Sequence, residues 1–159
     1  MNTLYQKEQY LWANQGDREW FNSGKRTFEC TKLMMSVKIY AILKAYGQEI
    51  FAENVDTLHG LATDFVEILR NNPRFELAVA PQSNIVCFRF VGDGTPPEGY
   101  NALNAVIRQK LLDEGNFYIV QTTLREKLSL RVSLMNPLTQ KEDLTALLAE
   151  IEEIAARIG

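Results

Sequence analysis

The stretch LSLRVSL, residues 128–134, alternates an aliphatic residue with a serine or an arginine at every step. Successive side chains of a β-strand point to opposite faces, so this spacing predicts a strand with one apolar face and one polar face. The apolar face requires cover from amphipathic helices. On the polar face, Arg131 stands between two small hydroxyl side chains, where its guanidinium could be solvated or could bind a carboxylate through two parallel hydrogen bonds.

Periodicity elsewhere in the chain predicts the elements that surround this strand. Further strands are expected over residues 75–79, 85–90 and 117–122, and helices over residues 28–46, 51–69, 103–114 and 139–158. Gly47 is placed to end the first helix in a left-handed cap, and Thr139 with Glu142 forms a predicted capping box for the last. After the first helix, the order α-β-β-α-β-β-α indicates an α+β fold, with a small antiparallel sheet and helices on one of its faces.

Three segments are expected along the chain. Residues 1–27 carry aromatic side chains without a regular period and predict an irregular arm. Residues 28–47 predict a long connecting helix, which is apolar on most of its circumference and is therefore expected to be buried between two bodies. Residues 48–159 are expected to form the small α+β domain, in which Phe51, Val55, Leu58, Phe65 and Leu69 continue a core stripe.

Composition limits the classes of function. The 159 residues are 46% hydrophobic and 23% charged, which is typical of a globular domain. The net charge of −3 gives no basic footprint for nucleic acid or for an anionic membrane. No signal peptide is expected, lysines interrupt the most apolar stretch, and Cys30 and Cys87 are interpreted as core thiols, so we expect a cytoplasmic location.

Few residues are candidates for chemistry. His59, the single histidine, lies one step off a helical core stripe and is expected on the surface. Lys25 and Arg26 precede the first helix, where cations are electrostatically misplaced. We predict no catalytic, cofactor-binding or metal-binding residue in this chain, and Arg131 is the one candidate for binding a substrate.

Four blocks carry a resemblance to a known family. They are SGKRTFECTKLM at residues 23–34, LKAYG at 43–47, PQSNIVCFRF at 81–90 and LRVSLMNPLTQKEDLTALL at 130–148. Together they resemble the C-terminal part of the group II pyridoxal-phosphate-dependent amino-acid decarboxylases, the family of glutamate, aromatic-amino-acid and diaminobutyrate decarboxylases. The resemblance covers nearly the whole chain, although none of the blocks is a catalytic signature.

The resemblance implies a lyase that is larger than this chain. The fold would be the C-terminal small domain of a fold type I enzyme, and pyridoxal phosphate would be held by a missing N-terminal large domain, through a Schiff-base lysine upstream of Met1. The resemblance also implies an amino-acid substrate, a homo-oligomer such as a dimer, and no activity of this chain alone. Arg131 matches the family arginine that is implicated in holding a substrate carboxylate.

Two other interpretations of the residues remain open. The chain could be a stand-alone α+β module that binds a small anion on the Arg131 face, without catalysis. It could also be a structural piece whose first helix and arm mediate self-association. Neither interpretation requires a cofactor.

Overall fold

The computed structural model describes residues 35–92 and 96–158. The chain divides into two compact units, Met1–Ala52 and Glu53–Gly159, and each is described by itself. The predicted arm, the start of the connecting helix, Cys30, Lys25 and Arg26 lie outside the described residues. None of the described helices combines the length and the apolar composition that crossing a bilayer requires.

In the first unit, helix α1 spans Met35–Tyr46 and ends as the sequence predicts. Gly47 has a left-handed φ of 79°, and its N–H donates a hydrogen bond to the carbonyl of Leu43 at 3.0 Å. None of the residues of α1 is buried, and apolar side chains such as Val37 and Tyr40 are more than half exposed. The expected burial of this helix between two bodies stays a prediction.

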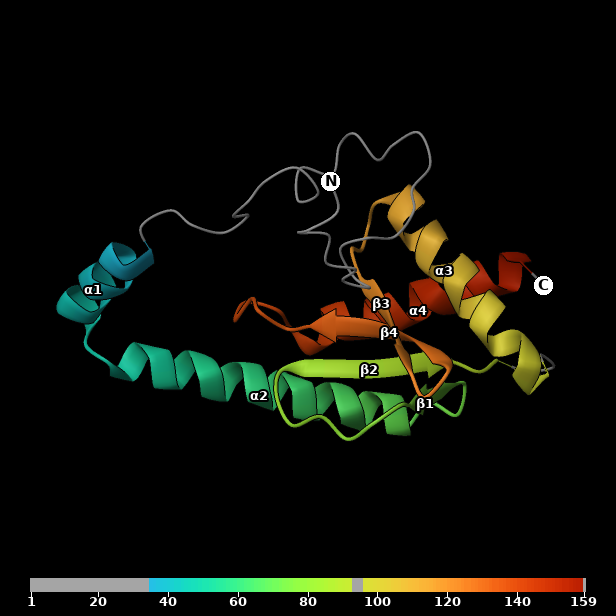
Figure 1. The fold of residues 1–159 in the computed structure, drawn as a ribbon, viewed down its shortest axis with the longest axis horizontal. Coiled ribbons are helices and arrows are strands. Elements are labelled where there is room, and N and C mark those ends of the chain that lie inside the picture. Colours follow the sequence, from blue (N-terminus) through green and yellow to red (C-terminus); the bar gives the residue numbers. More distant parts are fainter. Residues whose placement is uncertain (1–34, 93–95, 159) are drawn as a thin grey trace, which may run out of the picture. The chain divides into compact units, whose positions relative to one another are not determined.

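The second unit is built on a four-stranded antiparallel sheet (Figure 1). The strands are β1 (Phe75–Leu77), β2 (Ile85–Phe90), β3 (Val120–Leu124) and β4 (Lys127–Ser133), in the spatial order β1-β2-β4-β3. The α+β prediction is confirmed. The predicted bounds of β2 are met, whereas β3 and β4 are displaced toward the turn that joins them.

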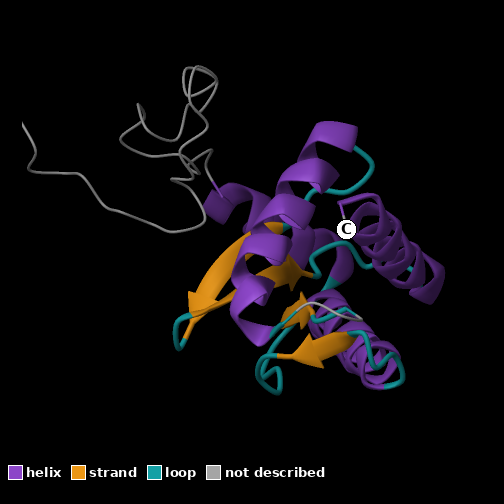
Figure 2. Cartoon of the chain, turned by 90° about the vertical axis from the view of Figure 1, so that its right-hand side faces the viewer, coloured by secondary structure: helices purple, strands orange, loops and turns teal. Residues whose placement is uncertain are grey.

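Helices α2 (Glu49–Arg70), α3 (Tyr100–Glu114) and α4 (Lys141–Ile158) supply the rest of the core, and a short 3-10 helix, η3, spans Pro97–Gly99. Their apolar stripes pack with alternate residues of β2 and β4, and Figure 2 shows these helices beside the twisted sheet. The rings of Phe65 in α2 and Phe88 in β2 meet edge to face at 5.3 Å. Leu130 and Leu134 belong to this core, so the alternation predicted for residues 128–134 is confirmed there. We call the helix-packed side of the sheet its inner face, and the opposite side its outer face.

Three positions that helical periodicity predicts in the core are exposed in the structure: Phe51 and Val55 in the second predicted helix, and Val106 in the third. Phe51 and Val55 of α2 are 38% and 53% exposed, because this helix joins the core only from Leu58 onward. Val106 of α3 is 42% exposed, and the polar residue Asn104 is fully buried on that helix. Hydrophobic periodicity located both helices but overestimated how much of each is covered.

Asn104 is buried because it completes the hydrogen bonding of a strand end. Pairing between β2 and β4 runs only as far as Phe88 and Leu130. Beyond that point the side chain of Asn104 accepts from the N–H of Phe90 and donates to the carbonyl of Phe90, both at 2.8 Å. One amide side chain therefore replaces the missing strand partner and fixes α3 to the sheet.

The cap of α4 differs from the predicted one. Thr139 and Glu142 do not form the capping box, because the helix begins one position later, at Lys141. The carboxylate of Asp143 instead accepts a hydrogen bond from the N–H of Gln140 at 2.9 Å. Acidic residues in the first turn also suit the positive end of the helix dipole.

Candidate functional site

Arg131 lies in β4, one of the two central strands, with its neighbours Leu130 and Val132 turned toward the core. It is half-buried, and in the sheet register it pairs with Cys87 of β2 and with Val120 of β3. The structure therefore places the predicted binding residue near the middle of the outer face. Among the described residues, no other residue predicted to belong to a site lies beside Arg131.

Cys87 is buried, as predicted, but it lies on the outer face beside Arg131 and outside the helix-packed core cluster. Burial raises the pKa of the Cys87 thiol above its ordinary value, and the positive charge of Arg131 opposes this rise. The thiol consequently stays neutral at physiological pH. It adds no negative charge next to the guanidinium.

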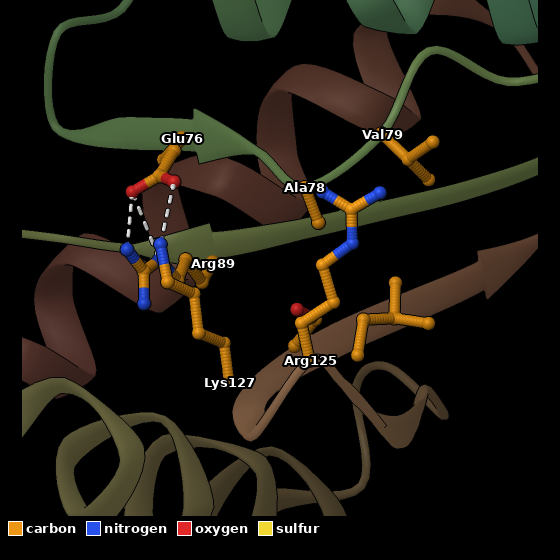
Figure 3. Close-up of a pocket in the computed structure, with 8 residues that line it drawn as sticks. Glu76, Ala78, Val79, Arg89, Arg125 and Lys127 are labelled. Carbon is orange, nitrogen blue, oxygen red and sulfur yellow. Dashed lines mark hydrogen bonds and ion pairs between the residues drawn. The ribbon is translucent and has the colours of Figure 1, made fainter.

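A cavity of about 310 Å³ opens near β1, β2 and the β3–β4 hairpin (Figure 3). Its lining is rich in charged side chains and includes residues from all four strands or their connections: Glu76, Ala78, Val79, Arg89, Leu124, Arg125, Lys127 and Ser129. Arg131 is not part of this lining. The outer face therefore carries two separate positive regions.

An ion-pair cluster forms one side of this cavity. The Nε of Arg89 donates to Oε2 of Glu76 at 2.9 Å, and Nη2 of the same guanidinium donates to the same oxygen. The Nζ of Lys127 lies 3.9 Å from Oε1 of Glu76. Arg89 is only 8% exposed, and its guanidinium lies 5.3 Å from the centre of the Tyr100 ring. Arg89 is therefore held from two sides.

Ser129 lies deeper in the same cavity. The sequence pattern places it on the polar face of β4, and the structure shows that it is fully buried there. Its Oγ has no hydrogen-bond partner among the described residues. A buried hydroxyl in that position is able to donate to an acceptor that enters the cavity.

The charged lining of the cavity is not among the residues predicted from the sequence. Glu76 and Arg89 each stand between two core residues of a short strand, and this alternation could have identified them as outward-facing. Arg125 and Lys127 lie at a turn, where periodicity carries no signal. His59 is exposed on α2, as predicted, and the described residues contain no group of metal ligands.

The described residues do not fit pyridoxal phosphate. A lysine that forms a Schiff base at neutral pH needs a pKa lowered by burial or by a neighbouring cation. Every lysine that the structure describes is exposed, namely Lys38, Lys44, Lys110, Lys127 and Lys141.

Comparisons with known proteins connect the fold to a family. The chain is 25% identical over 137 residues to L-2,4-diaminobutyrate decarboxylase of Acinetobacter baumannii, which covers 86% of this chain and 27% of the relative. It is 24% identical over 141 residues to an aromatic-L-amino-acid decarboxylase of Bacillus atrophaeus, covering 87% of this chain and 29% of the relative. The chain thus spans less than a third of the length of either relative.

Solved structures share the fold. The glutamate decarboxylase domain of a Vibrio parahaemolyticus diaminobutyrate-pyruvate transaminase and L-2,4-diaminobutyrate decarboxylase matches with a TM-score of 0.72 at 22% identity, over 87% of this chain and 29% of that one. Mouse CSAD in its apo form matches with a TM-score of 0.69 at 22% identity, over 95% and 32%. The family model described as the pyridoxal-dependent decarboxylase conserved domain matches residues 2–91. The chain belongs to the pyridoxal-dependent decarboxylase family.

Proposed function

We propose that this chain is the C-terminal part of a pyridoxal-phosphate-dependent amino-acid decarboxylase and that the outer face of its sheet closes one side of the active site. The position of Arg131 carries the proposal. In a chain of this family, a half-buried arginine stands at the middle of the outer face of a sheet whose inner face is already filled by helices.

In this proposal Arg131 orients the substrate by pairing with a carboxylate. A guanidinium offers two parallel N–H donors in a fixed plane, which match the two oxygens of a carboxylate. The adjacent Cys87 is a neutral thiol, so it does not compete with the substrate as a counter-ion. Holding one carboxylate in a fixed direction reduces the freedom of the substrate before reaction.

The remaining chemistry belongs elsewhere in the proposed enzyme. The lysines of the described residues are exposed, so the cofactor and the lysine that binds it are assigned to a large N-terminal domain. Both relatives are more than three times as long as the segment they share with this chain, which leaves room for such a domain. The chain alone is expected to be inactive, and the assembled enzyme is expected to be a dimer in the cytoplasm.

The first experiment examines the chain alone. Purified chain is incubated with pyridoxal phosphate, reduced with borohydride and digested, and lysine adducts are quantified by mass spectrometry. We expect no lysine to be modified stoichiometrically, because every lysine that the structure describes is exposed. Stoichiometric modification of one lysine, or release of carbon dioxide from any amino acid, would contradict the proposal.

The second experiment examines Arg131 in the full-length enzyme that the proposal requires. Arg131→Met should raise the KM for the amino-acid substrate about 10- to 100-fold, the loss typical of a charge-assisted hydrogen-bonded pair. Arg131→Lys should recover part of this loss, because it restores the charge but not the paired donors. Arg70→Met, at the exposed end of α2, is the matched control. An unchanged KM for Arg131→Met would exclude the carboxylate role.

The gene provides an independent test. The proposal requires that the reading frame continue upstream of the codon for Met1 into a large domain with a cofactor lysine. A ribosome-binding site directly before Met1 would instead support a stand-alone module.

A further inference from the structure

We propose that the cavity beside the β3–β4 hairpin is a binding site for a small dianionic oxyanion, such as a phosphate group or a short dicarboxylate. The site is formed by Arg89, Arg125, Lys127 and Ser129, and it does not include Arg131. It does not depend on the proposed decarboxylase role, because every residue that forms it belongs to the described part of this chain.

The charge balance of the lining favours an anion. Three cationic side chains, Arg89, Arg125 and Lys127, face a single carboxylate, that of Glu76. Glu76 is shared between Arg89 and Lys127, and Arg125 forms no ion pair with any described residue. Three positive charges and one negative charge leave a surplus of two, which a dianion would neutralise.

Arg89 is preorganised to donate. A guanidinium has five N–H donors, and the two hydrogen bonds to Glu76 leave three of them available. Because Arg89 is nearly buried and also lies against the Tyr100 ring, little side-chain entropy remains to be lost on binding. A buried, fixed guanidinium binds an oxyanion more strongly than a mobile surface lysine does.

Ser129 supplies an independent observation that points to a ligand. It is fully buried, it lines the cavity, and its Oγ is unsatisfied among the described residues. Buried hydroxyl groups nearly always have a partner, since leaving one unpaired is costly. An oxygen of a bound anion would accept this hydrogen bond.

The hairpin turn holds Arg125 at the cavity in spite of an unfavourable backbone. Arg125 and Glu126 have φ values of 50° and 66°, the left-handed conformation that two-residue hairpins usually assign to asparagine and glycine. Figure 3 shows the Arg125 side chain extended from the turn toward Ala78. Strained residues of this kind cluster at binding sites, where the side chain is needed in a fixed place.

The dimensions of the cavity limit the ligand to a small molecule. Its volume of about 310 Å³ is at the lower end of the range for ligand pockets. A phosphate group or a dicarboxylate with a few carbon atoms fits this volume. The two oxyanion classes share the donors described above, so the experiment must separate them.

The test is a titration of the purified chain with inorganic phosphate and, separately, with glutarate, followed by amide chemical shifts at constant ionic strength. We expect saturable shifts at Ala78, Arg125 and Ser129 with at least one of the two anions, and none with chloride. Saturation by phosphate alone assigns the site to phosphate groups, and saturation by glutarate alone assigns it to dicarboxylates. Equal shifts with chloride, or saturable shifts confined to Arg131 and Cys87, would overturn the proposal.

Variants connect the binding to the named residues. Arg125→Gln should lower the affinity for the anion about tenfold, because it removes a charged hydrogen bond. Ser129→Ala should lower it about threefold, because the hydrogen bond that it removes is neutral. Arg125 is exposed at a turn, so its replacement should leave the fold intact, and unfolding in urea verifies this. Arg70→Gln removes the same charge far along the sequence on α2 and should leave the affinity unchanged. An Arg125→Gln chain that binds as tightly as the parent chain would overturn the proposal.

Discussion

From Val86 to Phe90, the two faces of β2 are almost equally buried but consist of different side chains. On the inner face, Val86, Phe88 and Phe90 are at most 5% exposed and belong to one apolar cluster. On the outer face, Cys87 and Arg89 are each 8% exposed, and Arg89 is tied to a carboxylate and an aromatic ring. Low exposure therefore does not separate the core from a site. The two faces are distinguished by whether contacts are apolar or directional.

The inner face should give the largest effect on stability. Replacing Phe88 with alanine removes a fully buried ring that contacts both Phe65 and Phe75. We expect the free energy of unfolding to fall by about 3–5 kcal/mol, because a cavity remains where the ring was. Urea unfolding followed by circular dichroism measures this change.

A matched change on the surface tests the specificity of that result. Tyr118 is 78% exposed, so Tyr118→Ala should alter the free energy of unfolding by less than about 0.5 kcal/mol. The contrast between the two faces would be contradicted if Phe88→Ala changed the free energy of unfolding as little as Tyr118→Ala does.

Replacing Asn104 should give the next largest loss of stability, because its hydrogen bonds to the backbone of Phe90 are buried. Asn104→Ala leaves the N–H and the carbonyl of Phe90 without partners, and each buried unsatisfied group costs about 1–3 kcal/mol. We expect a loss of about 2–4 kcal/mol in urea unfolding. Asn101→Ala removes an exposed amide from the same helix turn and should cost about 1 kcal/mol or less. Equal losses for both variants would show that burial is not the cause.

Substitutions in the β3–β4 hairpin turn should raise the stability rather than lower it. Replacing Arg125 and Glu126 with asparagine and glycine relieves two left-handed residues and should raise the free energy of unfolding by about 1 kcal/mol. Glu126→Gly alone keeps the arginine and should give part of this gain with unchanged anion binding. If the double variant were less stable than the parent chain, the turn would not be strained.

Cys87 should give the smallest effect, and one that depends on pH. Burial is the main cause that raises the pKa of its thiol above the ordinary value of 9.0, with the charge of Arg131 acting against it. Around pH 9.0 the unfolded chain therefore binds fewer protons than the folded chain, and stability falls as the pH rises through the folded pKa. The Cys87→Ala variant should not show this loss of stability at high pH, because it lacks the thiol. Urea unfolding of both chains below and above pH 9.0 measures it, and parallel curves would contradict the assignment.

The fold was largely predictable because its apolar spacing is regular. The bounds of β2 follow from six residues between turn signals, and the alternation in residues 128–134 identified the inner face of β4. Periodicity could not predict how much of each helix is buried against the core. Phe51 and Val55 continue a helical stripe beyond the part of α2 that reaches the core, so their exposure depends on tertiary structure.

The candidate site was predictable only in part, for a similar reason. Arg131 could be placed because it interrupts an aliphatic strand. The cavity combines Glu76, Arg89 and Lys127 from strands that are distant in sequence, and only the register brings them together. Asn104 has no signature in a single sequence, since its role depends on where β2 and β4 stop pairing.

The double hydrogen bond between Asn104 and Phe90 also makes a single amide a reporter of local motion. The N–H of Phe90 is protected from solvent by a side chain of α3 rather than by a neighbouring strand. Its hydrogen exchange therefore follows the detachment of that helix, while amides inside the β2–β4 ladder follow opening of the sheet. Comparing the two exchange rates would separate helix undocking from global unfolding without any substitution.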